Sequence, residues 1–320
     1  MMKYRKIFLL IFAIVTLSGA TQVNAEKKIV VDKNGNGNFT SLQEAINSVR
    51  AFDPVGPTTI FVKNGTYYEK IVISEHTCNV KIEGEDKDRT IITYNDHANI
   101  NKMGTFRTYT LQVRGNDITL ENLTVENNAE RLGQAVALHT EGDRIAIRNC
   151  KLLGNQDTFY AAGENRRIYL ENTYIEGTTD FIFGGATAWF ENCEIFCKTN
   201  SYITAASTAQ HVKYGFIFNN CKIALADSVD AMYLGRPWRA YAMTVFMNCY
   251  LPKGIRPEGW HNWDNTENEK TARYAEYNNS GEGSRTTKRV KLAKILSKKE
   301  AKNFTLKNVL KDFDNQLKNP

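Results

Sequence analysis

The sequence lacks several patterns, and each absence argues against a class of protein. It has no Cys-x-x-Cys pair, and its five histidines do not cluster with one another or with groups of cysteines, which argues against a structural zinc site. A leucine framework is missing, and so is i, i+3, i+4 apolar spacing across the repeated part, which argues against leucine-rich and helical repeats. After residue 25 no apolar run is long enough to span a bilayer, so we expect no membrane span in the mature chain.

The charge pattern argues against a nucleic-acid partner. Of 41 basic and 35 acidic residues, 1–25 holds three basic ones and 288–320 holds ten basic and three acidic, which leaves 28 basic and 32 acidic residues in 26–287. Basic and aromatic residues are not interleaved along that body as a nucleic-acid groove requires. The tail 288–320 carries a pattern of apolar residues among its lysines, so we expect it to pack back onto the body. Weak attraction of the tail to an anionic polymer is the alternative.

The first 25 residues have the pattern of a secretory signal. Lys3, Arg5 and Lys6 precede an apolar run from Ile7 to Leu17, and Val23-Asn24-Ala25 resembles a cleavage site. The run is too short for a membrane span. We therefore expect a signal peptide over 1–25, a single domain over 26–320, and a secreted or periplasmic product.

Six segments repeat one pattern: short strand, asparagine, small or apolar residue, short strand. Apolar residues alternate within them, as at Ile145 and Ile147, which is the period of a half-buried strand. Asparagine suits a sharp bend because it tolerates left-handed backbone. The 20- to 28-residue period favours an all-β solenoid, a parallel β-helix, over the alternative of chance Asn-Cys pairs in a β-sandwich. The repeated asparagines are Asn122, Asn149, Asn172, Asn192, Asn220 and Asn248.

The residue after each asparagine is expected to point into the solenoid. These residues are Leu123, Cys150, Thr173, Cys193, Cys221 and Cys249. Four cysteines in one inward column favour free, buried thiols that act as small apolar groups. Because export permits disulfides, a Cys193–Cys197 or a Cys221–Cys249 bridge stays open as an alternative.

The N-terminal part is expected to close one end of the solenoid. Ser41 and Glu44 have the spacing of a capping box, and the helix after them places Leu42, Ala45, Ile46 and Val49 on one face. Such a helix would cover the first coil and protect its edge. We expect strands at 28–31, 59–63, 71–73 and 80–83.

Two aspartates occupy the same phase of consecutive repeats. Asp157 lies eight residues after Asn149, and Asp180 lies eight after Asn172, so both should meet on one face, about 4.8 Å apart per rung. Two adjacent carboxylates cannot both ionise easily, and this gives an acid and a base or nucleophile from identical side chains. Arg236 is the candidate that keeps one of them ionised. Gln134 and Gln156 could donate hydrogen bonds to an oxyanion.

Five short strings, taken together, resemble the pectin methylesterase (pectinesterase) family of carbohydrate esterases. They span nearly the whole mature chain in the family's order: GTYYE at 65–69, QAVAL at 134–138, QDT at 156–158, DFIFG at 180–184 and LGRPW at 234–238. One such string is weak evidence, but five in order on an independently inferred β-helix are strong. The resemblance implies a right-handed parallel β-helix that hydrolyses methyl esters of galacturonate units in pectin.

The resemblance also implies roles for single residues. Asp180 would be the nucleophile, and Asp157 would protonate the leaving methanol and then act as base for water. Gln156 would stabilise the oxyanion, with Gln134 assisting there or holding substrate. Arg236 would orient and neutralise Asp180.

Four further positions match residues that line the family's sugar subsites. Trp238 would stack against a sugar face, and Thr105, Tyr160 and Phe183 would line the cleft. The resemblance implies no metal, no organic cofactor and pectin as the partner. We expect a monomer.

Two other function classes compete with the esterase. A pectate lyase or polygalacturonase would need a calcium cluster beside a basic catalyst, or acids spaced for glycosidic cleavage with a neighbouring histidine. Neither arrangement surrounds residues 157 and 180. A non-catalytic polysaccharide-binding β-helix would have aromatic rows without the in-phase aspartates.

Overall fold

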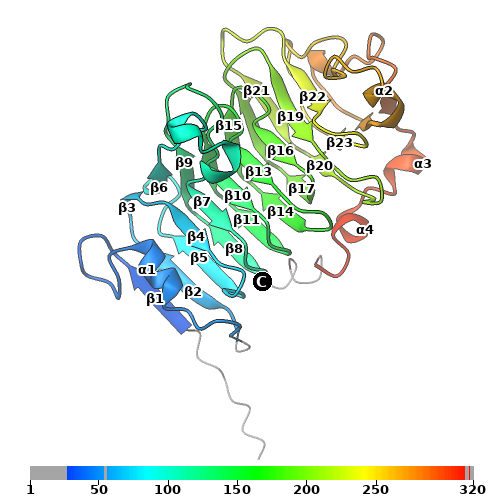
Figure 1. Ribbon diagram of the computed structural model, residues 1–320. Coiled ribbons are helices and arrows are strands. Elements are labelled where there is room, and N and C mark those ends of the chain that lie inside the picture. The colour runs from blue at the N-terminus through cyan, green and yellow to red at the C-terminus, as the bar shows by residue number, and fades with distance from the viewer. Residues whose placement is uncertain (1–26, 54–55, 314–316, 318–320) are drawn as a thin grey trace, which may run out of the picture.

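The computed structural model describes residues 27–53, 56–313 and 317, and the expected signal peptide lies outside them. The described chain winds into the expected parallel β-helix, whose coils stack from the N-terminal end in blue to the C-terminal end in orange (Figure 1). Three sheets of 11, seven and seven strands form its sides, and all their paired strands run parallel. In the described part of the chain, no helix is long and apolar enough to cross a membrane.

Each sheet takes one strand from successive coils. The long sheet contains β1 Lys27–Val31, β2 Thr58–Val62, β5 Val80–Gly84, β8 Ile118–Glu121, β11 Ile145–Arg148, β14 Arg167–Glu171, β17 Thr187–Glu191, β20 Phe216–Asn219, β23 Met243–Met247, β24 Arg273–Tyr277 and β25 Ala293–Ile295. The second sheet contains β4 Ile71–Ile73, β7 Leu111–Val113, β10 Leu138–Thr140, β13 Phe159–Ala161, β16 Ile182–Gly184, β19 Tyr202–Ala206 and β22 Tyr233–Pro237. The third sheet contains β3 Gly65–Tyr68, β6 Thr90–Tyr94, β9 Thr124–Asn127, β12 Lys151–Leu153, β15 Tyr174–Gly177, β18 Glu194–Cys197 and β21 Lys222–Leu225.

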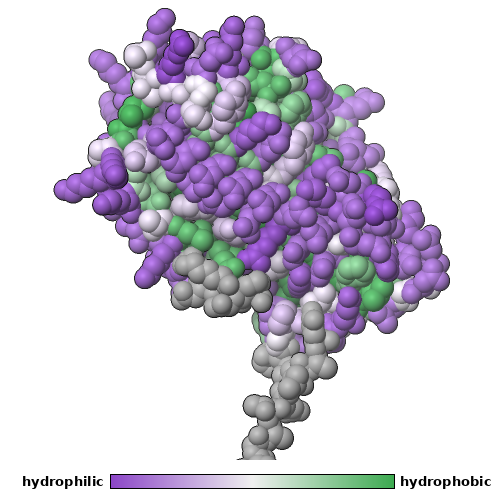
Figure 2. Space-filling model, turned by 180° about the vertical axis from the view of Figure 1, so that it is seen from behind, coloured by the Kyte–Doolittle hydropathy of each residue, from purple (hydrophilic) through white to green (hydrophobic). Residues whose placement is uncertain are grey.

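Helical segments are short and lie outside the sheets. The α-helices are α1 Leu42–Asn47, α2 Asn268–Thr271, α3 Lys298–Ala301 and α4 Leu306–Leu310, and the 3₁₀ turns are η1 Ile100–Lys102, η2 Thr105–Arg107 and η3 Glu282–Ser284. The face turned away from the viewer of Figure 1 is covered mainly by hydrophilic side chains, with small apolar patches between them (Figure 2).

The repeated asparagines form the bend between the long and third sheets. All six have φ between 49° and 55°, the left-handed backbone that the sequence predicts. Two of the six bond directly to each other, with Asn149 Nδ2 donating to Asn122 Oδ1 at 2.7 Å. Asn278, with φ 50°, continues the column and was not expected; its Nδ2 donates to Asn248 Oδ1 at 2.8 Å.

The inward column is confirmed. Every residue that follows one of the six asparagines is at most 2% exposed, and all six cysteines are free thiols. Stacked rings fill the interior beside this column, with centroids of Phe190 and Phe218 4.2 Å apart and those of Phe218 and Phe246 4.4 Å apart. Burial raises the pKa of the Cys150 thiol to about 12, so this thiol stays protonated and behaves as an apolar group.

The helix α1 closes the first coil, as expected, but the N-terminus of this helix is not capped as the expected capping box would cap it. The Ser41 side chain accepts from the Glu44 backbone N–H at 3.3 Å, as a capping box requires. The reciprocal partner is Glu69 from the next coil, whose carboxylate accepts from the Ser41 hydroxyl at 2.7 Å and the Leu42 N–H at 3.0 Å. An ionised carboxylate suits the positive end of a helix, so Glu69 has a structural role here.

The C-terminal tail returns over the outer face of the long sheet. Val309, Leu310 and Phe313 are buried there against residues such as Tyr169 and Ile217. Figure 1 shows α4, in red, beside this sheet. The described part of the tail therefore packs on the coils, as its apolar pattern predicts.

Candidate functional site

Asp157 and Asp180 lie on adjacent coils, immediately before β13 and β16. Phe159 pairs with Ile182 in parallel register, so the two aspartates occupy equivalent positions one strand spacing of about 4.8 Å apart. Both have left-handed backbone, with φ of 66° and 51°, and they are only 8% and 5% exposed. The equal spacing from Asn149 and Asn172 thus produces two neighbouring buried carboxylates.

Arg236 pairs with Asp180, and this pairing makes the two carboxylates chemically different. Its Nε donates to Asp180 Oδ1 at 3.0 Å and its Nη2 donates to Asp180 Oδ2 at 2.7 Å. The guanidinium itself is held between two rings, with its central carbon 4.0 Å from the Tyr202 centroid and 3.7 Å from the Trp263 centroid. A bidentate pair of this kind fixes both the position and the charge of Asp180.

The proton affinities of the two aspartates differ for physical reasons. Burial raises the pKa of Asp157 well above its usual range, and the nearby charge of Asp180 raises it further, with Arg236 opposing more weakly. Burial also raises the pKa of Asp180, but the hydrogen bonds and charge of Arg236 offset part of that rise. Asp180 is therefore the first of the two to ionise, and Asp157 keeps its proton to higher pH.

Asp157→Asn is expected to stabilise the fold near pH 7. The pKa of Asp157 in the folded state is raised above its ordinary value of 3.8, so the folded state binds this proton more tightly than the unfolded state. The free energy of unfolding therefore falls as the pH rises from 3.8 toward the pKa of the folded state. Asparagine cannot ionise and avoids this loss. Urea unfolding at pH 7 and pH 4 should show a stability gain in the variant that is clearly smaller at pH 4. A variant less stable than wild type by the same amount at both pH values would contradict the raised pKa.

A hollow of about 310 Å³ opens over the two aspartates. Eight of the nine residues predicted from the sequence line it: Thr105, Gln134, Gln156, Asp157, Asp180, Phe183, Arg236 and Trp238. The ninth, Tyr160, stacks on Phe183 with centroids 4.5 Å apart and meets Trp238 edge-on at 6.4 Å. All nine are thus brought together around one opening.

The two glutamines lie on neighbouring coils at the edge of this hollow. The N–H of Ala135, next to Gln134, donates to the Gln156 carbonyl at 3.1 Å. Within the described part of the chain, no hydrogen bond holds either amide side chain. Both amides can therefore turn their N–H groups toward an oxygen atom that forms in the hollow.

Gly184 explains why the DFIFG string ends in glycine. Its φ is 121°, and a Cβ atom at this position would meet the carbonyl oxygen of Ala161 at 2.1 Å. Directly after Phe183 the coil passes so close to its neighbour that only a residue without a side chain fits there.

Three lining residues were missed by sequence reasoning. Phe106, Ala205 and Trp263 also line the hollow. Ala205 pairs with both Phe183 and Arg236, so an explicit alignment of the second-sheet strands would have placed it. Trp263 lies in a long connection without a repeat, and nothing in its local sequence indicates that it covers Arg236.

Groups of three or more metal-ligating side chains do not occur among the residues described. The polar part of the hollow consists of the aspartates, the glutamines, Arg236 and Thr105, and aromatic rings make up its sides. This arrangement combines two carboxyl groups of different pKa, amide donors and flat apolar surfaces. It suits acyl transfer on a sugar.

Comparison with known proteins decides the family. The Pectinesterase family model matches residues 28–313. The chain belongs to the pectinesterase family. Members of this family are carboxylic ester hydrolases. Pectinesterase 31 of Arabidopsis thaliana is 37% identical over 292 residues, which cover 87% of this chain and 90% of that protein.

Some plant relatives contain about twice as much chain. Probable pectinesterase/pectinesterase inhibitor 13 of Arabidopsis thaliana is 35% identical over 306 residues, which cover 90% of this chain but 49% of that protein. The match between this chain and that protein is thus confined to about half of the longer one.

Solved pectinesterases share the fold of this chain. Pectin methylesterase from carrot superposes with a TM-score of 0.85 at 28% identity, over 91% of this chain and 95% of that one. A pectin methylesterase solved in complex with hexasaccharide VII superposes with a TM-score of 0.77 at 27% identity, over 90% and 98%.

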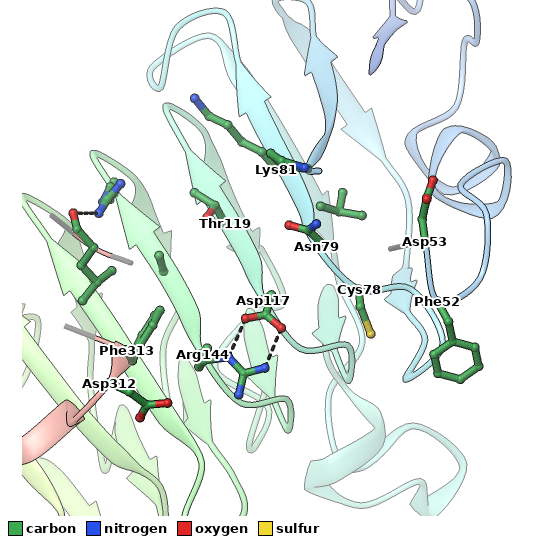
Figure 3. A pocket seen from close by; sticks show the side chains of 15 residues that line it. Phe52, Asp53, Cys78, Asn79, Lys81, Asp117, Thr119, Arg144, Asp312 and Phe313 are labelled. Carbon is green, nitrogen blue, oxygen red and sulfur yellow. Dashed lines mark hydrogen bonds and ion pairs between the residues drawn. The ribbon is translucent and has the colours of Figure 1, made fainter. Parts of the chain in front are cut away.

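A second, larger hollow of this pectinesterase lies elsewhere, on the outer face of the long sheet. It measures about 660 Å³ and lies between the loop that carries Phe52 and the tail that carries Phe313 (Figure 3). Its charged groups already have partners: Arg144 holds Asp117, and Lys81 meets Glu121 at 2.8 Å. The Asp157–Asp180 pair and the glutamines are not part of it, so we place the chemistry in the smaller hollow.

Proposed function

We propose that this pectinesterase hydrolyses methyl esters of galacturonate units in pectin and leaves pectate and methanol. The observation that carries the proposal is the bidentate Arg236–Asp180 pair beside Asp157, which keeps its proton. Family membership supports the substrate class, because similar solved structures are pectin methylesterases and two of them hold a hexasaccharide.

In the first half-reaction, Asp180 acts as nucleophile. A carboxylate oxygen of Asp180 attacks the ester carbonyl carbon, and the carbonyl electrons move to the oxygen. As the intermediate collapses, the C–O bond to methanol breaks and Asp157 gives its proton to the leaving oxygen. The products are methanol, ionised Asp157 and a mixed anhydride between Asp180 and the galacturonyl group.

In the second half-reaction, water takes the place of methanol. Asp157 is now a base and accepts a proton from the attacking water. Collapse of the second intermediate breaks the bond to Asp180 and releases the galacturonic acid group, which gives its proton to solvent, and it leaves ionised Asp180 and protonated Asp157. Arg236 receives the ionised Asp180 again, so the enzyme returns to its starting charge.

The developing oxyanion needs donors in both half-reactions. Gln156, beside Asp157, is the principal candidate, and Gln134 from the preceding coil assists it or holds substrate. Removal of one preorganised donor costs about 2.7–4 kcal/mol in comparable sites. Trp238, Phe183 and Tyr160 supply flat surfaces for the sugar rings.

The substrate class bears on where the protein acts. Pectin is an extracellular polymer, so we include in the proposal a secreted or periplasmic mature chain, 26–320, that acts as one domain and as a monomer. Nucleic acid is not among the proposed partners.

Product analysis tests the proposal. The protein is incubated with highly methylated pectin, and methanol, unsaturated ends and reducing ends are measured. Methanol without new chain ends supports the esterase. Unsaturated or reducing ends would point to a lyase or a glycosidase instead, and the absence of all three products would point to a binding protein.

A further inference from the structure

A hollow lies under the C-terminal tail, on the outer face of the long sheet. It measures about 590 Å³ and is bordered by β23 and β24 on one side and by β25 and α3 on the other. Its floor is largely apolar and includes Met243, Leu296 and Phe304. No residue that lines the catalytic hollow also lines this one. The tail hollow is thus a separate place with the size and lining of a small-ligand site.

An arginine without an acidic partner lines the tail hollow. Arg273 donates from Nε to the Tyr241 carbonyl at 2.9 Å and from Nη1 to the Val212 carbonyl at 2.8 Å. Its Nη2 donates to the Ala209 carbonyl at 3.2 Å. Among the described residues no carboxylate oxygen lies within 4 Å of this guanidinium, and burial lowers its pKa. A guanidinium has five N–H groups, so two of them remain for a further acceptor.

The one acid among the lining residues already has partners. The carboxylate of Glu300 lies 2.5 Å from Lys294 Nζ and accepts from the Ser297 backbone N–H at 2.8 Å. At the edge of the hollow, the exposed side chain of Lys213 lies over the ring of Tyr214, with its Nζ 4.8 Å from the ring centroid. Within the described part of the chain, no carboxylate oxygen lies within 4 Å of this Nζ. The tail hollow therefore presents two positive charges that no acid compensates.

Exposed lysines extend this positive surface along the tail. Lys298 and Lys299 lie on α3, Lys302 directly follows it, and Lys307 lies on α4. In 27–53 and 56–313 no carboxylate oxygen lies within 4 Å of any of the four ammonium groups. The other side of α4 is fixed to the coils, since Leu310 is fully buried. Unpaired cations in series on a fixed support suit a polymer with repeated negative charges.

We propose that the tail hollow and these four lysines form an exosite, a second binding site for a de-esterified, anionic galacturonate chain. One acidic sugar unit lies on the apolar floor with its carboxylate on Arg273 and Lys213, and the carboxylates of neighbouring units meet the tail lysines. The identity of the polymer rests on the proposed esterase function, because each turnover converts a neutral ester into a carboxylate. The exosite holds the enzyme on long pectin while the catalytic hollow acts on esters elsewhere.

Binding of fully de-esterified polygalacturonate tests the exosite. The background variant is Trp238→Ala, which weakens binding in the catalytic hollow. Lys213→Glu added to this background should weaken the remaining binding about tenfold at low salt, the effect of one lost hydrogen bond to a charged group. At high salt the difference should shrink, because exposed charges are screened. The triple change Lys298→Gln, Lys299→Gln and Lys302→Gln should weaken binding too and make it less dependent on salt.

A matched control and a kinetic measurement sharpen the test. Lys27→Glu makes the same charge change at an exposed lysine on β1, at the opposite end of the long sheet, and should leave polygalacturonate binding unchanged. Methanol release is then measured with Lys213→Glu alone. On a short methylated oligosaccharide that fills only the catalytic hollow, its kcat and KM should equal those of wild type. On long, partly de-esterified pectin its KM should rise severalfold with kcat unchanged.

The outcomes separate this proposal from the esterase function. If Lys213→Glu and the triple variant keep the affinity of the background, the tail binds no galacturonate chain and the proposal is wrong. If Lys27→Glu weakens binding equally, the effect is one of overall charge and the proposal is wrong as well. Binding to anionic phospholipid vesicles without binding to polygalacturonate would identify a membrane surface as the partner instead. Polygalacturonate carries no ester, so a wild type that releases no methanol refutes the esterase function, and the binding result still decides the exosite.

Discussion

Asp180→Asn is expected to reduce methanol release to less than about one hundredth of the wild-type rate, a loss of at least ~2.7 kcal/mol in transition-state stabilisation. An amide oxygen is a poor nucleophile, and it cannot hold the ionic pair that Arg236 makes through both carboxylate oxygens. The measurement is the initial rate of methanol release from highly methylated pectin, with thermal unfolding recorded on the same sample.

The companion variant Asp157→Asn makes the same substitution at the neighbouring aspartate and serves as the control. It should also slow turnover severely, because it removes the proton donor. Its effect on stability should be opposite, since Asp180→Asn leaves the guanidinium of Arg236 without its counter-charge, whereas Asp157→Asn removes a buried acid that resists ionisation. An Asp180→Asn enzyme that keeps more than about one hundredth of the wild-type rate would refute the nucleophile assignment, provided that it is folded.

The position of this pair could be predicted because a β-helix converts sequence phase into spatial position. Asn149 and Asn172 adopt the same left-handed bend, so residues eight positions later start equivalent strands on adjacent rungs. The inward cysteines follow from the same rule. Where the repeat holds, the number of residues between two positions therefore predicts whether they lie on neighbouring coils at the same place.

Where the repeat fails, the sequence gives no comparable signal. Trp263, which covers Arg236, belongs to the long connection between β23 and β24. Glu69 replaces Glu44 as the second partner at the start of α1 because a neighbouring coil lies there, and no local spacing reveals such a neighbour. Before the first repeated asparagine, Asn122, only some of the strands were predicted, and β3 and β6 were missed.

The C-terminal coils should depend on one buried ion pair. Glu276 on β24 and Arg289 are 2% and 3% exposed at their side chains, and Arg289 Nε donates to Glu276 Oε1 at 2.7 Å. The Trp260 indole N–H donates to the same oxygen at 3.1 Å. Arg289 also donates to the backbone carbonyls of Pro257 and Gly283, so the pair connects three segments of the chain's end.

Glu276→Ala is expected to destabilise the protein by about 3–5 kcal/mol, because it leaves Arg289 charged and buried without an acid. Loss of the acceptor for Trp260 adds to that cost. The thermal midpoint should fall by roughly 5–15 °C. Circular dichroism and urea unfolding on the purified variant measure both quantities.

Two matched variants identify the cause of that loss. Glu267→Ala removes the acid of a pair whose side chains are 69% and 71% exposed, and it should cost less than about 1 kcal/mol. The double variant Glu276→Gln with Arg289→Met removes the stranded charge, so it should recover a large part of the stability lost in Glu276→Ala. If the double variant is as unstable as Glu276→Ala, the loss of stability comes from packing around Trp260 instead. The ion pair would then serve to position the last coils without stabilising them through its charges.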